Sequence, residues 1–104
     1  MSHRVLLTRK FQNREALRRA CERKEVGCQL VGDRITGKLY GTVKPAADGT
    51  FQIQIDNDYR RSFQTLESLY DIECAKLEAE AQNQSYEEVT EPDGTFALAI
   101  LVEY

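Results

Sequence analysis

The sequence predicts one α+β domain over residues 1–104, with two helices packed on one face of a mainly antiparallel sheet. Three observations lead to this fold class. Two segments repeat apolar side chains every three or four residues, as amphipathic helices do. Six short segments are rich in strand-forming residues and are separated by turn signals. The length is that of one domain, and no linker, repeat or low-complexity segment divides it.

The first predicted strand covers residues 5–11 and leads into the first helix. Asn13 can cap that helix, because its side chain can accept a hydrogen bond from a backbone N–H one turn later. The helix is expected over residues 14–25, and Gly27 is a natural stop. Its apolar stripe consists of Ala16, Leu17, Ala20 and Cys21. Two pairs of opposite charge at i,i+4 spacing support it: Glu15 with Arg19 and Arg18 with Glu22.

Three strands are expected next, over residues 28–31, 38–43 and 51–56. The turn between the last two contains Asp48-Gly49, a dipeptide typical of hairpins. Apolar and polar residues alternate throughout the strand 51–56, which predicts one buried face and one solvated face.

The second helix is expected over residues 65–83, where apolar residues recur at threes and fours. Strands 86–90 and 95–102 then pair across the turn Pro92-Asp93-Gly94. The last strand is apolar on both faces, which predicts a central position in the sheet. The order of the elements favours a ferredoxin-like core with one or more added strands.

A net charge of -3 conceals a strong separation of charge along the chain. Residues 1–44 contain eleven Lys/Arg and four Asp/Glu, a net +7, whereas residues 45–104 contain three and thirteen, a net -10. Such a separation orients a protein against charged partners and raises the rate at which they meet. We therefore expect opposite charges on opposite exteriors of the fold.

The leading hypothesis is a non-enzymatic protein-binding or accessory module that acts through these charged surfaces. Opposite patches on two copies also predict weak, head-to-tail self-association. We do not expect direct binding of nucleic acid, because glutamates interrupt the basic helix and no aromatic platform lies beside its arginines. The residues expected to contact a partner are Arg14, Arg18, Arg19, Arg23, Glu73, Glu78, Glu80 and Glu87.

Two alternatives stay open. The first is a phage-type, anti-CRISPR-like inhibitor, whose acidic surface would occupy the groove in which a host complex holds nucleic acid. The second is a metal-dependent phosphoryl-transfer enzyme, in which Asp56 and Asp58 would hold Mg²⁺ or Mn²⁺ and Arg60 would bind phosphate. The segment lacks the Gly and the late Glu of a calcium loop, so a turn capped by its own side chains is the preferred interpretation.

The residues that carry chemistry point to no enzyme, no cofactor and no metal. Cys21, Cys28 and Cys74 are odd in number and lack CxxC spacing, so we expect reduced, packing cysteines. His3 is the single histidine, and it cannot by itself define a zinc site or a catalytic triad. No apolar run reaches the ~20 residues of a membrane span, and residues 1–4 do not resemble a signal peptide. The expected location is cytoplasmic, without membrane contact.

Several blocks of the sequence carry a family resemblance. They are Met1-Ser2-His3, Glu15-Ala16-Leu17 with Ala20-Cys21, Tyr70, the alanine-rich helix to Ala81, Tyr86 with Val89, and Asp93-Gly94-Thr95 before the final apolar strand. In these blocks the chain resembles a small uncharacterised family of cyanobacterial, chloroplast-encoded and phage proteins. Its members are often encoded near an AAA-type ATPase. The resemblance implies an accessory role, with such an ATPase as a candidate partner, whereas the acidic-surface alternative implies a nucleic-acid-handling complex as the partner.

Overall fold

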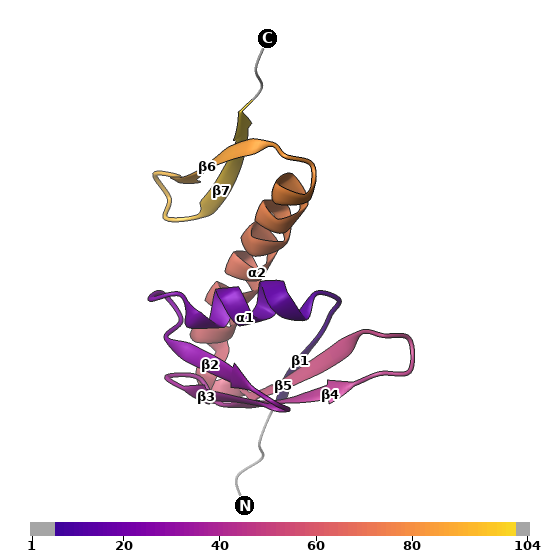
Figure 1. The fold of residues 1–104 in the computed structure, drawn as a ribbon. Helices are drawn as coiled ribbons and strands as arrows, with labels where there is room; N and C mark the ends of the chain where they lie inside the picture. Colours follow the sequence, from indigo (N-terminus) through magenta and orange to yellow (C-terminus); the bar gives the residue numbers. More distant parts are fainter. Residues whose placement is uncertain (1–5, 102–104) are drawn as a thin grey trace, which may run out of the picture.

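Five strands form one antiparallel sheet, and both helices lie on the same side of it (Figure 1). The computed structural model describes residues 6–101. The order across the sheet is β1-β5-β4-β3-β2. The α+β class, with a mainly antiparallel sheet and two helices, is therefore confirmed. The strands are β1 (Leu6–Phe11), β2 (Cys28–Val31), β3 (Arg34–Gly37), β4 (Gly41–Pro45) and β5 (Phe51–Asp56).

The short helix α1 (Arg14–Glu22) begins at the predicted cap, where the Asn13 side chain accepts a hydrogen bond from the Ala16 N–H at 3.0 Å. The long helix α2 (Arg60–Ala81) begins five residues earlier than predicted. The reason is a 3₁₀ turn, η1 (Asn57–Tyr59), which starts where the Asp56 side chain accepts from the Asp58 N–H at 3.0 Å. This turn leads directly from β5 into α2.

The core lies between the helices and the sheet. The alternating apolar residues of β5, namely Phe51, Ile53 and Ile55, are all buried, as the sequence predicted. The Tyr70 hydroxyl of α2 accepts hydrogen bonds from the backbone N–H groups of Gln12 and Asn13, at 3.1 and 3.0 Å. These bonds fasten the β1–α1 connection to α2. The apolar residues of α1 are also fully buried: Ala16, Leu17, Ala20 and Cys21.

The cysteines lie in or beside this core. Cys21 and Cys28 are buried in the core and Cys74 is half-buried against it, which confirms that they are packing residues, and no disulfide joins them. The neighbouring Cys28 side chain and burial together raise the pKa of the Cys21 thiol. A thiol held in its neutral form packs as a small apolar group.

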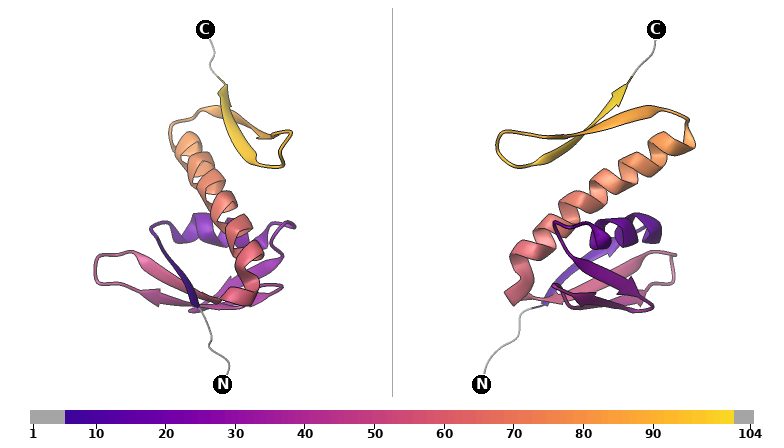
Figure 2. Two further views of the ribbon diagram at one scale, coloured as in Figure 1. Left: turned by 180° about the vertical axis from the view of Figure 1, so that it is seen from behind. Right: turned by 60° about the vertical axis from the view of Figure 1, so that its left-hand side comes forward.

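The last two strands, β6 (Ser85–Thr90) and β7 (Phe96–Leu101), form a separate two-stranded sheet at the far end of α2 (Figure 2). The predicted central position of the last strand is therefore wrong, and the sheet is not completed in the ferredoxin-like way. The cause is the length of α2, because 22 residues carry the chain roughly 33 Å. Asn83, with φ 55°, then reverses the chain and lays the hairpin beside the C-terminal half of that helix.

Within residues 6–101, neither helix combines the length and the apolar character that a membrane crossing needs.

Candidate docking surface

The four arginines predicted to face a partner are largely occupied inside the molecule. Arg18 forms ion pairs with Glu15 and Glu22 along α1. Arg19 lies 3.3 Å from Glu15 and 3.4 Å from Glu80 of α2. The Arg14 guanidinium donates to the backbone carbonyl of Gly32. The predicted i,i+4 pairs of α1 are thus confirmed, and they leave little free positive charge on this helix.

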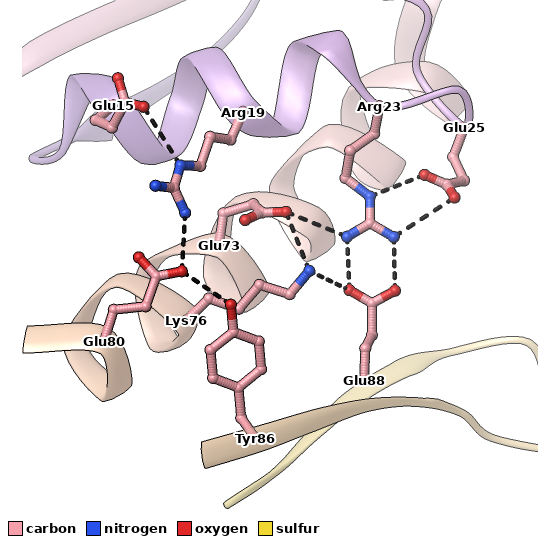
Figure 3. A network of polar contacts seen from close by, with 9 residues as sticks. All are labelled: Glu15, Arg19, Arg23, Glu25, Glu73, Lys76, Glu80, Tyr86 and Glu88. Carbon is pink, nitrogen blue, oxygen red and sulfur yellow. Dashed lines mark hydrogen bonds and ion pairs between the residues drawn. The ribbon is translucent and has the colours of Figure 1, made fainter. Parts of the chain in front are cut away.

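Arg23, just past the end of α1, is the centre of a larger network that joins three elements (Figure 3). Its guanidinium donates two hydrogen bonds to the Glu88 carboxylate of β6, at 2.6 and 2.7 Å. It also reaches Glu25 at 2.9 Å and Glu73 of α2 at 3.2 Å. Lys76 contacts Glu88 at 2.9 Å and Glu73 at 3.4 Å. The network therefore connects the end of α1 to α2 and to the hairpin.

The charged side chains of this network are mostly buried and stabilise one another, so the network has a structural role. The Arg23 side chain is 16% exposed and that of Glu73 is 7% exposed. The two-pronged contact with Arg23 lowers the pKa of the Glu88 carboxyl to about 2, and the pKa of Arg23 is raised in turn, chiefly by Glu88. The Arg23 guanidinium also lies 5.6 Å from the centre of the Phe96 ring in β7. These contacts hold the hairpin against the helices.

The predicted separation of the charges onto opposite exteriors is therefore wrong for two of the pairs. Arg19 meets Glu80, and Arg23 meets Glu73, because α1 and α2 pack side by side and place these side chains between them. Glu80 also accepts a hydrogen bond from the Tyr86 hydroxyl at 2.8 Å. The sequence pattern could not predict these contacts, because the paired residues lie far apart along the chain.

Glu78 and Glu87 differ from the other carboxylates of the predicted set. Both are exposed, and neither forms an ion pair with any residue in the described range 6–101. Glu78 lies near the end of α2 and Glu87 lies on β6, so both belong to the end of the molecule that carries the hairpin. Two of the eight predicted residues are thus free carboxylates in the part of the chain that the structure describes.

Large apolar side chains are exposed on the same hairpin. Val89 of β6 is 38% exposed, and Ile100 and Leu101 of β7 are 40% and 49% exposed. These residues and the two free carboxylates lie at one end of the molecule, which we call the hairpin end and define by Glu78, Glu87, Val89, Ile100 and Leu101. Glu87, Val89 and Leu101 share one face of the hairpin, whereas Ile100 lies on the other face. Sequence reasoning missed the apolar part. Its signal is the apolar last strand, whose pattern also fits the buried central position that the sequence predicts.

Three cations on the face of the sheet away from the helices add to the free positive charge. Lys10 of β1 and Lys44 of β4 are exposed and flank Gln52, which pairs with both across the sheet. Arg34 of β3 is exposed and pairs with Thr42 of β4. None of these three cations is in an ion pair within the described part of the chain. The molecule therefore keeps a polarity, with a basic sheet face and an acidic hairpin end.

The Asp56–Asp58 segment is a capped turn. Asp56 accepts from the Asp58 N–H, and the Arg60 Nε donates to the Asn57 side-chain oxygen at 2.9 Å. A shallow hollow of about 770 Å³ borders these residues and is also lined by Tyr40 and Tyr59. Among residues 6–101, no three His, Cys, Asp or Glu side chains gather in a way that could hold a metal ion.

The chain matches no protein-family model, and no curated protein and no solved structure matches it either.

Proposed function

We propose that the protein is a non-enzymatic protein-binding module and that it docks through the hairpin end. The observation that carries the proposal is the coincidence of free carboxylates with exposed apolar side chains on one end of the molecule. Docking surfaces combine an apolar centre with a polar rim that sets orientation. Val89 and Leu101 supply the apolar part and share a face with Glu87, while Ile100 and Glu78 add apolar area and charge at the same end.

The partner is a protein with a basic surface. Glu78 and Glu87 form no ion pair with any residue of the described range 6–101, so a Lys- or Arg-rich surface complements them. The family resemblance adds an AAA-type ATPase as the first candidate to test. The acidic-mimic alternative uses a smaller surface than the sequence implied, because Glu67, Asp71, Glu73, Glu80 and Glu88 are engaged in internal ion pairs.

Affinity capture with charge-reversed variants tests the proposal. The full chain is immobilised, exposed to extract of its native host at low salt, and the captured proteins are quantified by mass spectrometry. The double variant Glu78→Lys/Glu87→Lys is expected to lose the specific partner. Increasing salt is expected to weaken capture by the unmodified protein, because the contact is partly electrostatic.

The control is Asp33→Lys, which makes the same change of charge as either one of these two substitutions, at an exposed carboxylate in the β2–β3 turn, on the main sheet. This variant is expected to capture the partner as well as the unmodified protein does. Equal capture by the double variant would show that the hairpin end is not the docking surface. Equal loss in both variants would show that overall charge alone governs binding.

A further inference from the structure

Strand β7 has an open edge. It pairs with β6 along its whole length, from Phe96 opposite Thr90 to Leu101 opposite Ser85, and with no other strand in residues 6–101. The Glu91 N–H donates to the Thr95 carbonyl at 2.8 Å, which shows which residue pairs of the two strands are hydrogen-bonded to each other. Bonded pairs then recur at every second residue, so Ala97 and Ala99 bond to β6. The backbone groups of Phe96, Leu98 and Ile100 point to the open side.

The side chains of β7 do not hinder another strand from pairing with this edge. Natural proteins cover an edge strand or place charges, proline or a bulge on it, because an unpaired edge is a template for another strand. The six residues of β7, Phe96-Ala-Leu-Ala-Ile-Leu101, contain none of these features. β6 by contrast carries Glu87 and Glu88. A strand that is apolar on both faces has the pattern of a central strand, yet here it has a neighbour on one side only.

We infer that the open edge of β7 pairs with β7 of a second copy of this chain, antiparallel and across a two-fold axis at Leu98. This register places Leu98 opposite its own copy and Phe96 opposite Ile100. All the outward-pointing backbone groups then find partners, on the order of six hydrogen bonds. The two hairpins become one four-stranded sheet, with both β7 strands in the centre.

Charge favours this edge over the edge of β6. Two β7 strands bring no charged side chain opposite another, because β7 has none. The acidic β6 strands then lie at the outside of the four-stranded sheet, three strand spacings or about 14 Å apart. That separation exceeds the Debye length of about 8 Å at physiological salt, so their repulsion is screened. Pairing through β6 would instead place Glu87 and Glu88 beside their copies.

The contact differs from the head-to-tail association that the sequence predicted. A two-fold contact is closed and ends at a dimer, whereas head-to-tail contacts through opposite charges continue to larger assemblies. An interface made of one strand edge is small, so the dimer is weak and depends on concentration. The inferred dimer is related to the proposed function only because its contact lies at the same end of the molecule. A partner protein that covers β7 competes with the second copy for this strand.

Sedimentation analysis of the full chain over a wide range of concentration tests the inference. The average mass is expected to rise from the monomer value toward twice that value and no further. Increasing salt is expected to leave the dimer intact, because no ion pair forms it. A monomer at every concentration, growth beyond a dimer, or dissociation by salt would overturn the inference. If the capture experiment contradicts the proposed docking surface, the inferred dimer is not affected, so the two proposals can fail independently of each other.

Two proline variants locate the contact. Ile100→Pro removes an N–H that points to the open side of β7, and Thr90→Pro removes an N–H that points to the open side of β6. Neither N–H takes part in the β6–β7 ladder. Ile100→Pro is expected to give a monomer and Thr90→Pro to leave the dimer. Equal behaviour of the two variants would overturn the inference. Ile100→Lys, which places charge on the edge without removing a donor, is expected to give a monomer as well.

Amide hydrogen exchange supplies a residue-level readout that needs no variant. The N–H groups of Leu98 and Ile100 are expected to exchange more slowly as concentration rises. Those of Ala97 and Ala99 already bond to β6 and are expected to change less. Protection that is independent of concentration at Leu98 and Ile100 would overturn the inference.

Discussion

The β4–β5 hairpin and the β6–β7 hairpin each contain a turn of the same sequence and geometry. Each turn carries the sequence Asp-Gly-Thr-Phe, at residues 48–51 and 93–96. The aspartate accepts from the threonine N–H at 3.1 Å in the first turn and at 3.0 Å in the second. The glycine has φ 87° in one and 88° in the other. Bonds to threonine lower the pKa of both aspartates, Asp48 and Asp93. Local structure is thus nearly identical in the two hairpins.

The strands that leave these turns have different surroundings. β5 lies between β1 and β4, and its alternation of apolar and polar residues matches a sheet with helices on one face only. β7 is apolar on both faces, but it pairs on one side only and its last three residues are exposed. The comparison shows that a turn determines how the two strands of a hairpin pair with each other, but not which other strands lie beside them in a sheet. Here the length of α2 determines them.

Arg23 gives the largest expected effect, because it connects the outlying hairpin to the helices. Arg23→Ala leaves Glu73 buried without Arg23 and removes both bonds to Glu88. Breaking a buried pair costs about 3–5 kcal/mol of the free energy of unfolding, and the loss is expected toward the lower end because Lys76 stays in contact with both carboxylates. Urea denaturation measures this loss, and hydrogen exchange is expected to show that the β6–β7 amides open first.

Arg18→Ala is the control for that measurement, since Arg18 lies on the exposed side of α1 and pairs only along the helix within the described residues. Its stability is expected to change far less. Similar losses in the two variants would mean that the hairpin does not depend on the network.

Truncation of matched apolar residues in the two strands compares their packing directly. Ile53 of β5 is fully buried, so Ile53→Ala is expected to cost about 2–5 kcal/mol of the free energy of unfolding. Leu98 of β7 is half-buried in the monomer, so Leu98→Ala is expected to cost about 1 kcal/mol. Thermal and urea unfolding at low concentration measure both. Equal costs would show that β7 is packed as tightly as β5.

Features set by local sequence were predictable. The Asn13 cap, the alternating strand 51–56 and the turn at Pro92-Asp93-Gly94 all follow from residues close together in the chain, and the structure contains each of them. The class of the fold followed from these elements. The place of β7 did not, because an apolar strand has the same pattern whether its second neighbour belongs to its own chain or to another.

The candidate site was predictable to a smaller extent. Glu78 and Glu87 are exposed, as the expectation that they contact a partner requires. The pairs Arg19–Glu80 and Arg23–Glu73 were missed, because they form only when α1 packs on α2. Composition counts charges along the chain, whereas the free charge of a surface depends on which of them meet after folding.

Acid is expected to loosen the β6–β7 hairpin more than the β4–β5 hairpin. The pKa of Glu88 falls from its ordinary 4.5 to about 2 on folding, so its contribution is complete above the ordinary value and is lost as pH falls toward 2. The contribution is at most about 3 kcal/mol. Urea denaturation from neutral pH to pH 3 measures it. Glu88→Gln is expected to be less stable than the unmodified protein at neutral pH, and the difference is expected to shrink in acid. A constant difference would contradict this assignment.

The two turn glycines give the smallest effect and the most closely matched comparison. An added Cβ meets no atom within 4 Å at Gly49 or at Gly94, so Gly→Ala costs only the positive φ, about 1 kcal/mol at each site. The location of the loss differs, because β5 belongs to the main sheet and β7 does not. Gly49→Ala is expected to lower the global free energy of unfolding, measured with urea. Gly94→Ala is expected to speed hydrogen exchange within β6–β7 and to change the global value less. If both variants lower global stability equally, the two hairpins unfold as one cooperative unit.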